Sequence, residues 1–351
     1  MASGGESGER LTGVSTGLAA AALFGSSAPF AKLLLPETSA LALSAILYLG
    51  ASAALSLWCL VRREGAEASP RRADWPLLLG VILLGGIVGP VLMLLGLERM
   101  SALSVALMLN LEAAFTILLA VGLFGEHLGG LEALAAATVI FGATIVGLGP
   151  GNLHGDPLGA AEVAGACLAW GIDNNLSQRL SLRDPVATAR IKTLGAGACT
   201  LAIAFVLGYR LPAGAALGGA LAVGALCYGA SLVLDMKALR ILGAAREAAF
   251  FATAPFIGAI VAVIVFGKAP RVSEWTGGLL MAAGVVLLMR ERHAHLHTHQ
   301  EFEHDHLHVH DQHHRHVHPE PVAEPHSHPH RHAPLTHDHP HLSDLHHRHV
   351  H

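Results

Sequence analysis

Charged side chains are scarce in this chain, and their scarcity sets its class. Aspartate, glutamate, lysine and arginine make up 14% of the 351 residues, whereas hydrophobic residues make up 52%. A soluble domain carries roughly 25% charged residues, so the composition excludes an ordinary soluble protein. The formal net charge of −4 provides no basic surface for a nucleic acid, and no nucleic-acid partner is expected.

Cysteine motifs and nucleotide-binding motifs are also missing. No two of the four cysteines have the spacing of a metal site, and all four lie in apolar stretches, so neither a cysteine metal centre nor a disulfide framework is predicted. No GxxxxGK[ST] motif occurs, which argues against ATP-driven transport by this chain. The sequence therefore predicts a protein that is not an enzyme and that requires no cofactor for transport.

What the sequence has instead is a series of ten apolar segments separated by turn-rich breaks. A helix needs about 20 mostly apolar residues to cross a bilayer, and the segments lack the alternation of barrel strands, so each is predicted to be a transmembrane helix. We predict an all-α membrane protein with spans at about residues 13–35, 39–61, 75–97, 102–124, 129–149, 158–180, 186–208, 214–236, 244–266 and 273–290.

Lysine and arginine are unevenly distributed between the two sides of these spans. With the N-terminus in the cytoplasm, fourteen of them fall on the cytoplasmic side and five on the other side. Because cytoplasmic loops carry the excess of positive residues, we expect a multi-pass protein of the cytoplasmic membrane with both termini in the cytoplasm.

The two halves of the apolar region repeat each other. Phe124-Gly125-Glu126 recurs as Phe266-Gly267-Lys268 at an offset of 142 residues, and Ala102 falls on Ala244 at the same offset. Five spans per half is an odd number, so the second copy has the opposite orientation in the membrane. Inverted repeats are typical of secondary transporters, which hold their solute near the midplane between the halves.

The motifs around these repeats resemble a known family. Leu97-Glu98-Arg99-Met100-Ser101-Ala102, followed by Asn110-Leu111-Glu112, is similar to the first repeat of the EamA family in the drug/metabolite transporter superfamily. Ala238-Leu239-Arg240 and Ala254-Pro255-Phe256 are similar to the second repeat. The resemblance covers about residues 11–292 and implies a permease or exporter of small metabolites, drugs, amino acids or sugars.

The resemblance also divides the chain and marks one departure. We expect a short cytoplasmic N-terminus at 1–10, two five-helix repeats at 11–150 and 151–292, and a tail at 293–351. The family tends to place Glu-Pro in the middle of spans four and nine. Here the first repeat has Glu112-Ala113 and the second has Ala254-Pro255, so we do not expect two equivalent half-sites.

Several polar residues fall inside the spans and are candidates for a transport cavity. A charge such as Glu112 near the centre of a span costs roughly 2.5–3.5 kcal/mol on insertion scales, so it is expected to face the bundle interior as a proton carrier or cation ligand. The alternative is a packing role, with a hydrogen bond to a neighbour such as Asn110 or Thr116. Asn110 is included in the predicted cavity.

A second candidate group lies on span six. Trp170, Asp173, Asn174 and Ser177 have the i, i+3, i+4, i+7 spacing of one helix face, which suits a small polar or cationic solute. Hydrogen bonding between helices is the alternative. Ser27 and Pro255 lie in spans one and nine, where a proline frees a backbone carbonyl or bends the helix. Lys32, Asp235 and Glu247 lie near span ends, and we expect them to snorkel or cap.

The tail is different in kind, because 23 of the 25 histidines lie between His293 and His351. Its H-x-H pattern places neighbouring imidazoles on one side of an extended chain, and imidazole suits zinc, nickel, cobalt and copper. With few apolar residues, the tail is predicted to be disordered without a ligand. A solvated linker or a pH-responsive segment is the alternative. The candidate ligands are His293, His295, His297, His299, His304, His306, His308, His310, His313, His314, His316 and His318.

Three functions remain open at this point. The first is a metabolite permease whose tail senses or buffers a divalent metal. The second is a divalent-metal transporter, chiefly for efflux, whose tail collects ions; against it, the spans contain no histidine. The third is a membrane-tethered metal buffer or sensor. The expected partners are the lipid bilayer and a small-molecule or metal solute, with a homodimer as an open alternative.

Overall fold

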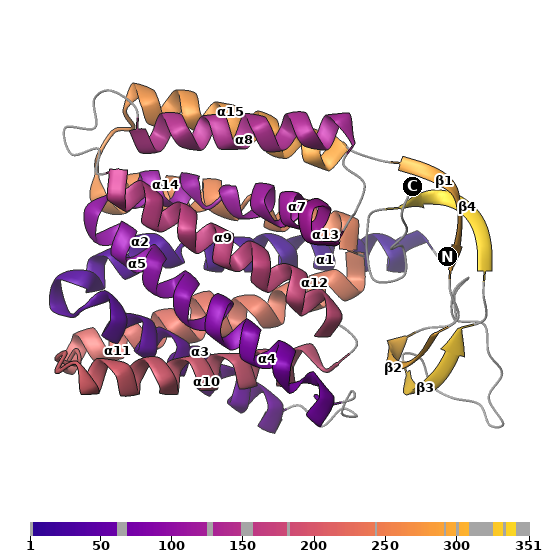
Figure 1. Cartoon of the computed structure of the whole chain (residues 1–351), viewed down its shortest axis with the longest axis horizontal. Helices are drawn as coiled ribbons and strands as arrows, with labels where there is room; N and C mark the ends of the chain where they lie inside the picture. The colour runs from indigo at the N-terminus through magenta and orange to yellow at the C-terminus, as the bar shows by residue number, and fades with distance from the viewer. Residues whose placement is uncertain are drawn as a thin grey trace.

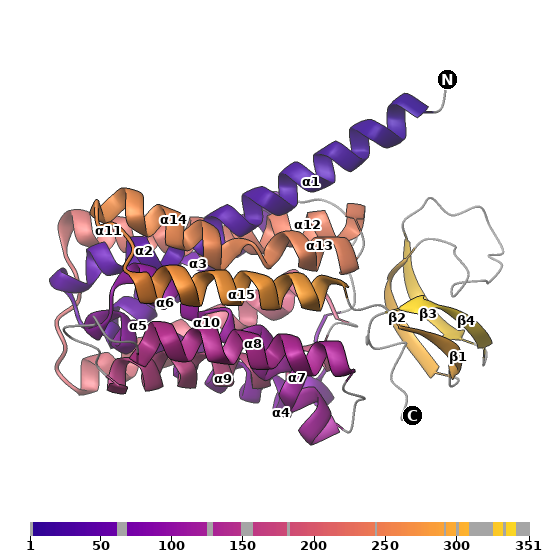
Figure 2. The ribbon, with the colours of Figure 1, turned by 90° about the horizontal axis from the view of Figure 1, so that it is seen from above.

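The protein is a bundle of long, nearly aligned helices (Figures 1 and 2). The computed structural model describes residues 3–61, 69–124, 129–148, 157–180, 183–242, 244–290, 293–299, 302–308, 326–332 and 335–341. Within these ranges, nine helical runs are long and apolar enough to cross a membrane. The 24-residue helix α9 (Pro157–Leu180) has the length of a tenth span. The predicted all-helical membrane fold with two five-helix repeats is confirmed.

The first repeat contains α1 to α8. Its elements are α1 (Ser3–Gly25), α2 (Ser27–Leu34), η1 (Leu35–Glu37), α3 (Ala40–Val61), η2 (Arg72–Asp74), α4 (Trp75–Val81), the π-helical η3 (Ile82–Val88), α5 (Gly89–Arg99), α6 (Ala102–Met108), α7 (Leu111–Phe124) and α8 (Gly130–Leu148). Helix α1 begins inside the stretch that the sequence assigned to a short N-terminal segment.

The second repeat follows the same order. Its elements are α9, α10 (Pro185–Val206), α11 (Gly214–Val223), the π-helical η4 (Gly224–Ala230), α12 (Ser231–Leu242), α13 (Ala244–Phe251), α14 (Ala254–Phe266) and α15 (Val272–Arg290). The π-helical stretches η3 and η4 lie 142 positions apart (82 to 224), as do α8 and α15 (130 to 272). The repeat seen in the sequence therefore extends to matching irregularities of the backbone.

Spans four and nine are each broken in the middle, at matching places. Between α6 and α7, the Asn110 side-chain amide donates to the Leu107 carbonyl at 2.7 Å, a local bond that competes with helical backbone pairing. Between α13 and α14, Pro255 lies in the first turn of α14 and brings no backbone N–H. The predicted continuous helices at 102–124 and 244–266 are thus two helices each.

Helices α8 and α15 lie side by side in both views, along the upper edge of the bundle in Figure 1 (Figures 1 and 2). Gly142 and Gly277 face each other here, since a Cβ on Gly142 would lie 2.8 Å from the Gly277 carbonyl oxygen. The two last helices of the repeats therefore pack backbone to backbone, as expected for small residues between membrane helices.

Four short segments of the tail are described. The structure describes four strands in it: β1 (His293–His299), β2 (Phe302–His308), β3 (His326–His332) and β4 (Leu335–His341). β1 pairs antiparallel with β4, and β2 with β3. The H-x-H pattern has the two-residue period of a strand, which the prediction used for metal binding but not for pairing. His310, His313, His314, His316 and His318 lie outside the described residues.

Candidate functional site

A cavity of about 420 Å³ lies between the two repeats. In the first repeat, its described lining residues lie on spans one to four. In the second repeat, they lie on α9, α10, η4, α12 and α13. It reaches Leu180 and Pro185, where α9 ends and α10 begins. We call this end of the bundle the cavity end, and we call the opposite end, where α5 ends and α6 begins, the sealed end.

Glu112 places its carboxylate on the wall of this cavity. It is the second residue of α7, directly after the break at Asn110, so the broken helix sets its position. Its Oε1 accepts a hydrogen bond from Asn174 Nδ2 at 2.9 Å, and the same amide lies 3.3 Å from Thr116 Oγ1. The partner from α9 replaces the predicted neighbours Asn110 and Thr116. A carboxylate held by one amide keeps capacity to accept further hydrogen bonds.

Asp173 forms an ion pair with Lys192 on α10. Asp173 is buried, with 4% of its surface exposed, and its Oδ1 also accepts from Ser177 at 3.4 Å. A Cβ at Gly85 would overlap the Asp173 carboxylate, so the glycine in η3 leaves the room that the acid occupies. A lysine from the next helix therefore balances the charge of Asp173.

Aromatic rings form much of the remaining wall. Tyr48 Oη and Trp170 Nε1 both donate to the Gly85 carbonyl oxygen, at 2.9 and 3.1 Å. The two rings are thereby held against the π-helical turn, the kind of irregularity that is frequent at functional sites. Phe24, Tyr228 and Phe251 line the cavity further toward the cavity end. The Phe24 ring centroid lies 5.2 Å from that of Phe251 and 6.1 Å from that of Tyr228.

The structure brings together six of the eight predicted cavity residues, namely Ser27, Glu112, Trp170, Asp173, Asn174 and Ser177. Asn110 and Pro255 are not among the lining residues. The Asn110 amide is buried against Leu107 and the Met281 sulfur instead. Lys192, Tyr48 and Tyr228 were not predicted, because they face the cavity only through the packing of helices that are distant in sequence.

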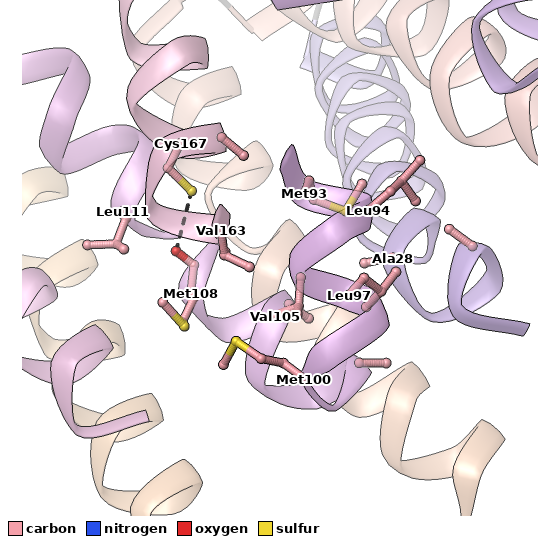
Figure 3. Packing of buried hydrophobic residues seen from close by; sticks show 14 of the residues in the cluster. Ala28, Met93, Leu94, Leu97, Met100, Val105, Met108, Leu111, Val163 and Cys167 are labelled. Carbon is pink, nitrogen blue, oxygen red and sulfur yellow. Dashed lines mark hydrogen bonds between the residues drawn. The ribbon is translucent and has the colours of Figure 1, made fainter. Parts of the chain in front are cut away.

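Two features close the sealed end: a core of buried apolar side chains, and hydrogen bonds and ion pairs between neighbouring helices. Met93, Leu94, Leu97, Val105 and Met108 pack between the repeats with at most 3% of their surfaces exposed (Figure 3). The close-up also shows the Cys167 thiol directed at the Met108 carbonyl oxygen, at 3.6 Å (Figure 3).

The polar links join helices of both repeats at this sealed end. Glu274 Oε1 on α15 accepts from the hydroxyls of Ser101 and Ser104 at 3.0 and 2.7 Å. Arg99 Nε lies 3.1 Å from Glu162 Oε2 on α9. Lys32 donates to the backbone carbonyls of Leu97 and Met100. It therefore caps the end of the neighbouring helix α5, which is one of the two roles expected from the sequence. In the described part of the chain, the apolar core and these links therefore separate the cavity from the sealed end.

Asp235 and Glu247 do not behave as the sequence predicted. Asp235 lines the cavity and Glu247 is buried, with 9% of its surface exposed. They hydrogen-bond to each other instead of snorkelling to the surface or capping a helix. The sequence could have suggested this only through the α12–α13 turn, which brings the end of one helix back against the start of the next.

Comparison with known proteins identifies the architecture. The sequence profile described as the EamA-like transporter family matches residues 11–148 and again residues 158–290. The chain belongs to the EamA-like transporter family. The two matches coincide with the two structural repeats, and the resemblance stated from the motifs is confirmed. The chain is thus a multi-pass membrane protein of a transporter family.

Individual relatives agree with this placement. A protein of Methanothermobacter thermautotrophicus, described as an uncharacterized transporter, is 30% identical over 298 residues, covering 80% of this chain and 86% of the relative. The uncharacterized inner membrane transporter YedA of Escherichia coli is 25% identical over 169 residues, covering 47% and 55%. One crystal structure shares the fold with a TM-score of 0.57 and 19% identity, covering 80% of this EamA-like chain and 96% of the other.

Proposed function

We propose that this EamA-like protein moves a small organic cation, such as an amine-bearing metabolite, through the cavity between its repeats. The observation that carries the proposal is the arrangement of Glu112 among aromatic rings. Its carboxylate accepts one described hydrogen bond, from Asn174, and it shares the cavity wall with Trp170 and Tyr48. An ammonium group gains both from the carboxylate and from ring faces, by a cation–π interaction of about 0.5–2 kcal/mol.

The balance of charge on the wall supports the same solute class. The described lining includes the carboxyl groups of Glu112, Asp173 and Asp235 and the ammonium group of Lys192. Lys192 is already paired with Asp173, so the remaining acids have no described lysine or arginine facing them in the cavity. A volume of about 420 Å³ lies at the lower end of the range of small-molecule sites.

We propose further that the solute is exchanged by alternating access. The inverted repeat provides two related arrangements, in which either end of the bundle is closed. The loops at the cavity end are rich in arginine, so we assign this end to the cytoplasmic side. In this arrangement the described structure corresponds to an inward-facing state, with the sealed end toward the outside and both termini in the cytoplasm.

Transport by reconstituted vesicles tests the proposal. Small amines, amino acids, sugars and organic anions are offered to the full-length protein, and uptake is compared for the wild type, Glu112→Gln and Glu132→Gln. We expect amine uptake that falls about tenfold to a hundredfold in Glu112→Gln, because a hydrogen bond to a charged group contributes about 1.5–3 kcal/mol. Glu132, at the start of α8 and away from the cavity, is the control. Equal amine uptake by the Glu112→Gln variant and the wild type would contradict the assigned role.

The histidine-rich tail supports a second proposal, that it binds a divalent metal such as zinc, nickel, cobalt or copper at the cytoplasmic surface. The strand register pairs His293 with His341, His295 with His339 and His297 with His337. It also pairs histidines at three positions of β2 and β3. Cross-strand partners lie on the same face of a ribbon, so the register supports the proposal by pairing histidine positions with one another.

Whether metal is the cargo, a signal or a stored ion is decided by one comparison. Vesicles containing the full-length chain, or a chain ending at Arg292, are assayed for uptake of radioactive zinc, nickel and cobalt and of an amine. If metal is the cargo, truncation raises the apparent KM for metal. If metal is a signal, truncation removes a metal dependence from amine transport. A tail that binds metal without either effect is a buffer.

A further inference from the structure

Asp235 and Glu247 form a polar group that is separate from Glu112 and Asp173. Their side chains hydrogen-bond to each other across the α12–α13 turn. Asp235 lines the cavity, and the neighbouring Glu247 is buried, with 9% of its surface exposed. Asp235 Oδ1 and Glu247 Oε1 are buried and have no hydrogen-bond partner among the described residues. No other described group satisfies these two oxygens, so the pair itself needs a bound proton for one carboxyl group to donate to the other.

The chemistry of the pair specifies what is bound. A carboxylate oxygen only accepts hydrogen bonds, so two carboxyl groups can hydrogen-bond to each other only when one of them carries a proton. Two ionised carboxylates in contact repel each other, and one of the two then holds its proton strongly. A carboxyl pair that shares one proton in this way carries one negative charge.

The described positive charges around the pair do not neutralise its carboxyl groups, so the shared proton is not displaced by an ion pair. The described charged or titratable groups on the elements packed around the pair are Lys237 on α12, Arg246 on α13, Tyr48 and Cys59 on α3, Cys227 and Tyr228 on η4, and Arg190, Lys192 and Cys199 on α10 with Asp184 at its start. Lys237 stands 4.5 Å from the centre of the Trp58 ring, and Lys192 pairs with Asp173. None of these described cations forms an ion pair with either carboxyl. The side chains of Arg240 and of the first residues of α1, including Arg10, lie outside the described part of the chain.

The internal repeat shows that the fold does not require these acids. At the offset of 142, Asp235 corresponds to Met93 and Glu247 to Val105. Met93 and Val105 are 1% and 0% exposed and belong to the apolar core, and Met93 also lines the cavity with its apolar side chain (Figure 3). Two apolar side chains fill the equivalent place in the first repeat, so packing alone does not account for a buried carboxyl pair in the second.

We propose that Asp235 and Glu247 form a proton-binding site at the cavity end, and that its proton leaves when a cation occupies the cavity. This inference rests on the proposed transport of organic cations. One O–H bond of the pair breaks, the proton passes through Asp235 to cavity water, and the pair becomes doubly negative beside the bound cation. When the cation leaves, a proton from water restores the O–H bond. One proton is thus exchanged for one positive charge.

The site itself is tested without any solute. Full-length protein in lipid vesicles is titrated from about pH 5 to about pH 9, a range that includes the titration of buried carboxyl groups, while the infrared band of protonated carboxyl groups is followed. We expect Asp235→Met/Glu247→Val, which copies the first repeat, to lose one titrating carboxyl proton relative to wild type. The isosteric pair Asp235→Asn/Glu247→Gln is the second variant, should the first fail to fold. Glu274→Gln, a buried carboxyl whose two oxygens are both hydrogen-bonded, should keep the signal. Identical titrations of wild type and both double variants would overturn the site.

The exchange is tested with a quaternary ammonium ion, tetraethylammonium, which carries no proton of its own. A pH-sensitive dye is enclosed in the vesicles and the ion is added outside. We expect ion uptake with release of protons to the outside in the wild type and in Glu132→Gln, and a loss of at least about tenfold in proton movement in the double variants. Ion uptake without proton movement would overturn the exchange. If no ion is taken up, the transport proposal fails for this solute class, while the infrared titration still decides whether the proton site exists.

Discussion

The two ends of the bundle are built from equivalent parts of the two repeats, yet one is dry and the other is polar. In the first repeat, Met93 and Val105 are buried among apolar neighbours, and Met93 also touches the cavity. In the second repeat, the equivalent Asp235 and Glu247 hydrogen-bond to each other beside the cavity. The π-helical stretches η3 and η4 precede both places. The fold therefore accepts either apolar or carboxyl side chains at these positions.

The same divergence occurs at the midplane. Glu112 in the first repeat corresponds to Ala254 in the second, and Pro255 corresponds to Ala113. The structure gives Glu112 a place on the cavity wall, whereas Pro255 only begins helix α14. Each repeat therefore contributes different carboxyl groups to one cavity, Glu112 from the first and Asp173 with Asp235 from the second.

The largest expected effect comes from exchanging the chemistry of the two ends. Val105→Glu places a carboxyl in the dry core without a partner, at a cost of about 2.5–3.5 kcal/mol on insertion scales, and should sharply reduce the folded protein recovered from membranes. Glu247→Val, the reverse change, should cost less than about 1.5 kcal/mol, because the equivalent position already accepts valine. Thermal unfolding in detergent measures both. Equal losses would show that the two ends do not differ as described.

The Asp173–Lys192 pair gives the next largest effect. Asp173→Asn leaves a buried ammonium without its partner, which costs about 3–5 kcal/mol for a fully buried pair and less here, since the Lys192 side chain is 21% exposed. Asp173→Asn/Lys192→Met removes both charges and should restore much of the lost stability and amine transport. A double variant no better than the single one would show that Asp173 contacts the solute directly.

The tail should respond to pH without affecting either end of the bundle. Metal binding requires neutral imidazole, whose ordinary pKa is about 6.5, so affinity for metal falls as pH drops through that value. Full-length protein should bind several zinc or nickel ions at about pH 7.5 and release them near about pH 5. The chain ending at Arg292 is the control. Equal metal binding by the two chains would assign the ions to the bundle instead.

The smallest effects are expected from the ion pairs at the two ends. Asp74 and Arg183 join η2 to the α9–α10 junction at 2.7 Å, whereas Arg99 and Glu162 join α5 to α9 at the sealed end. Partly exposed pairs contribute about 0–1 kcal/mol, so Arg183→Ala and Arg99→Ala should shift access to the cavity by severalfold at most, in opposite directions. Labelling of a cysteine placed at Ser177 from each side of the membrane measures the shift. Labelling of a tail cysteine from outside would contradict the expected orientation.

The sequence by itself determined the class of the fold, because long apolar segments in a bilayer have few alternatives to helices. The offset of 142 residues and the odd number of spans were enough to predict an inverted repeat, and the motifs pointed to the family. The i, i+3, i+4, i+7 stripe on span six also predicted that Trp170, Asp173, Asn174 and Ser177 share one face, since helical spacing is a local property.

Only the tertiary structure decided how these groups are paired. Lys192 reaches Asp173 and Asn174 reaches Glu112, and neither partner can be found from spacing because the helices concerned meet only in the packed bundle. Asp235 and Glu247 look like ordinary span-end acids in the sequence, and the α12–α13 turn makes them a buried pair. The reason is physical: periodicity fixes which face of a helix a residue occupies, whereas the partner of a buried charge depends on which other face is packed against it.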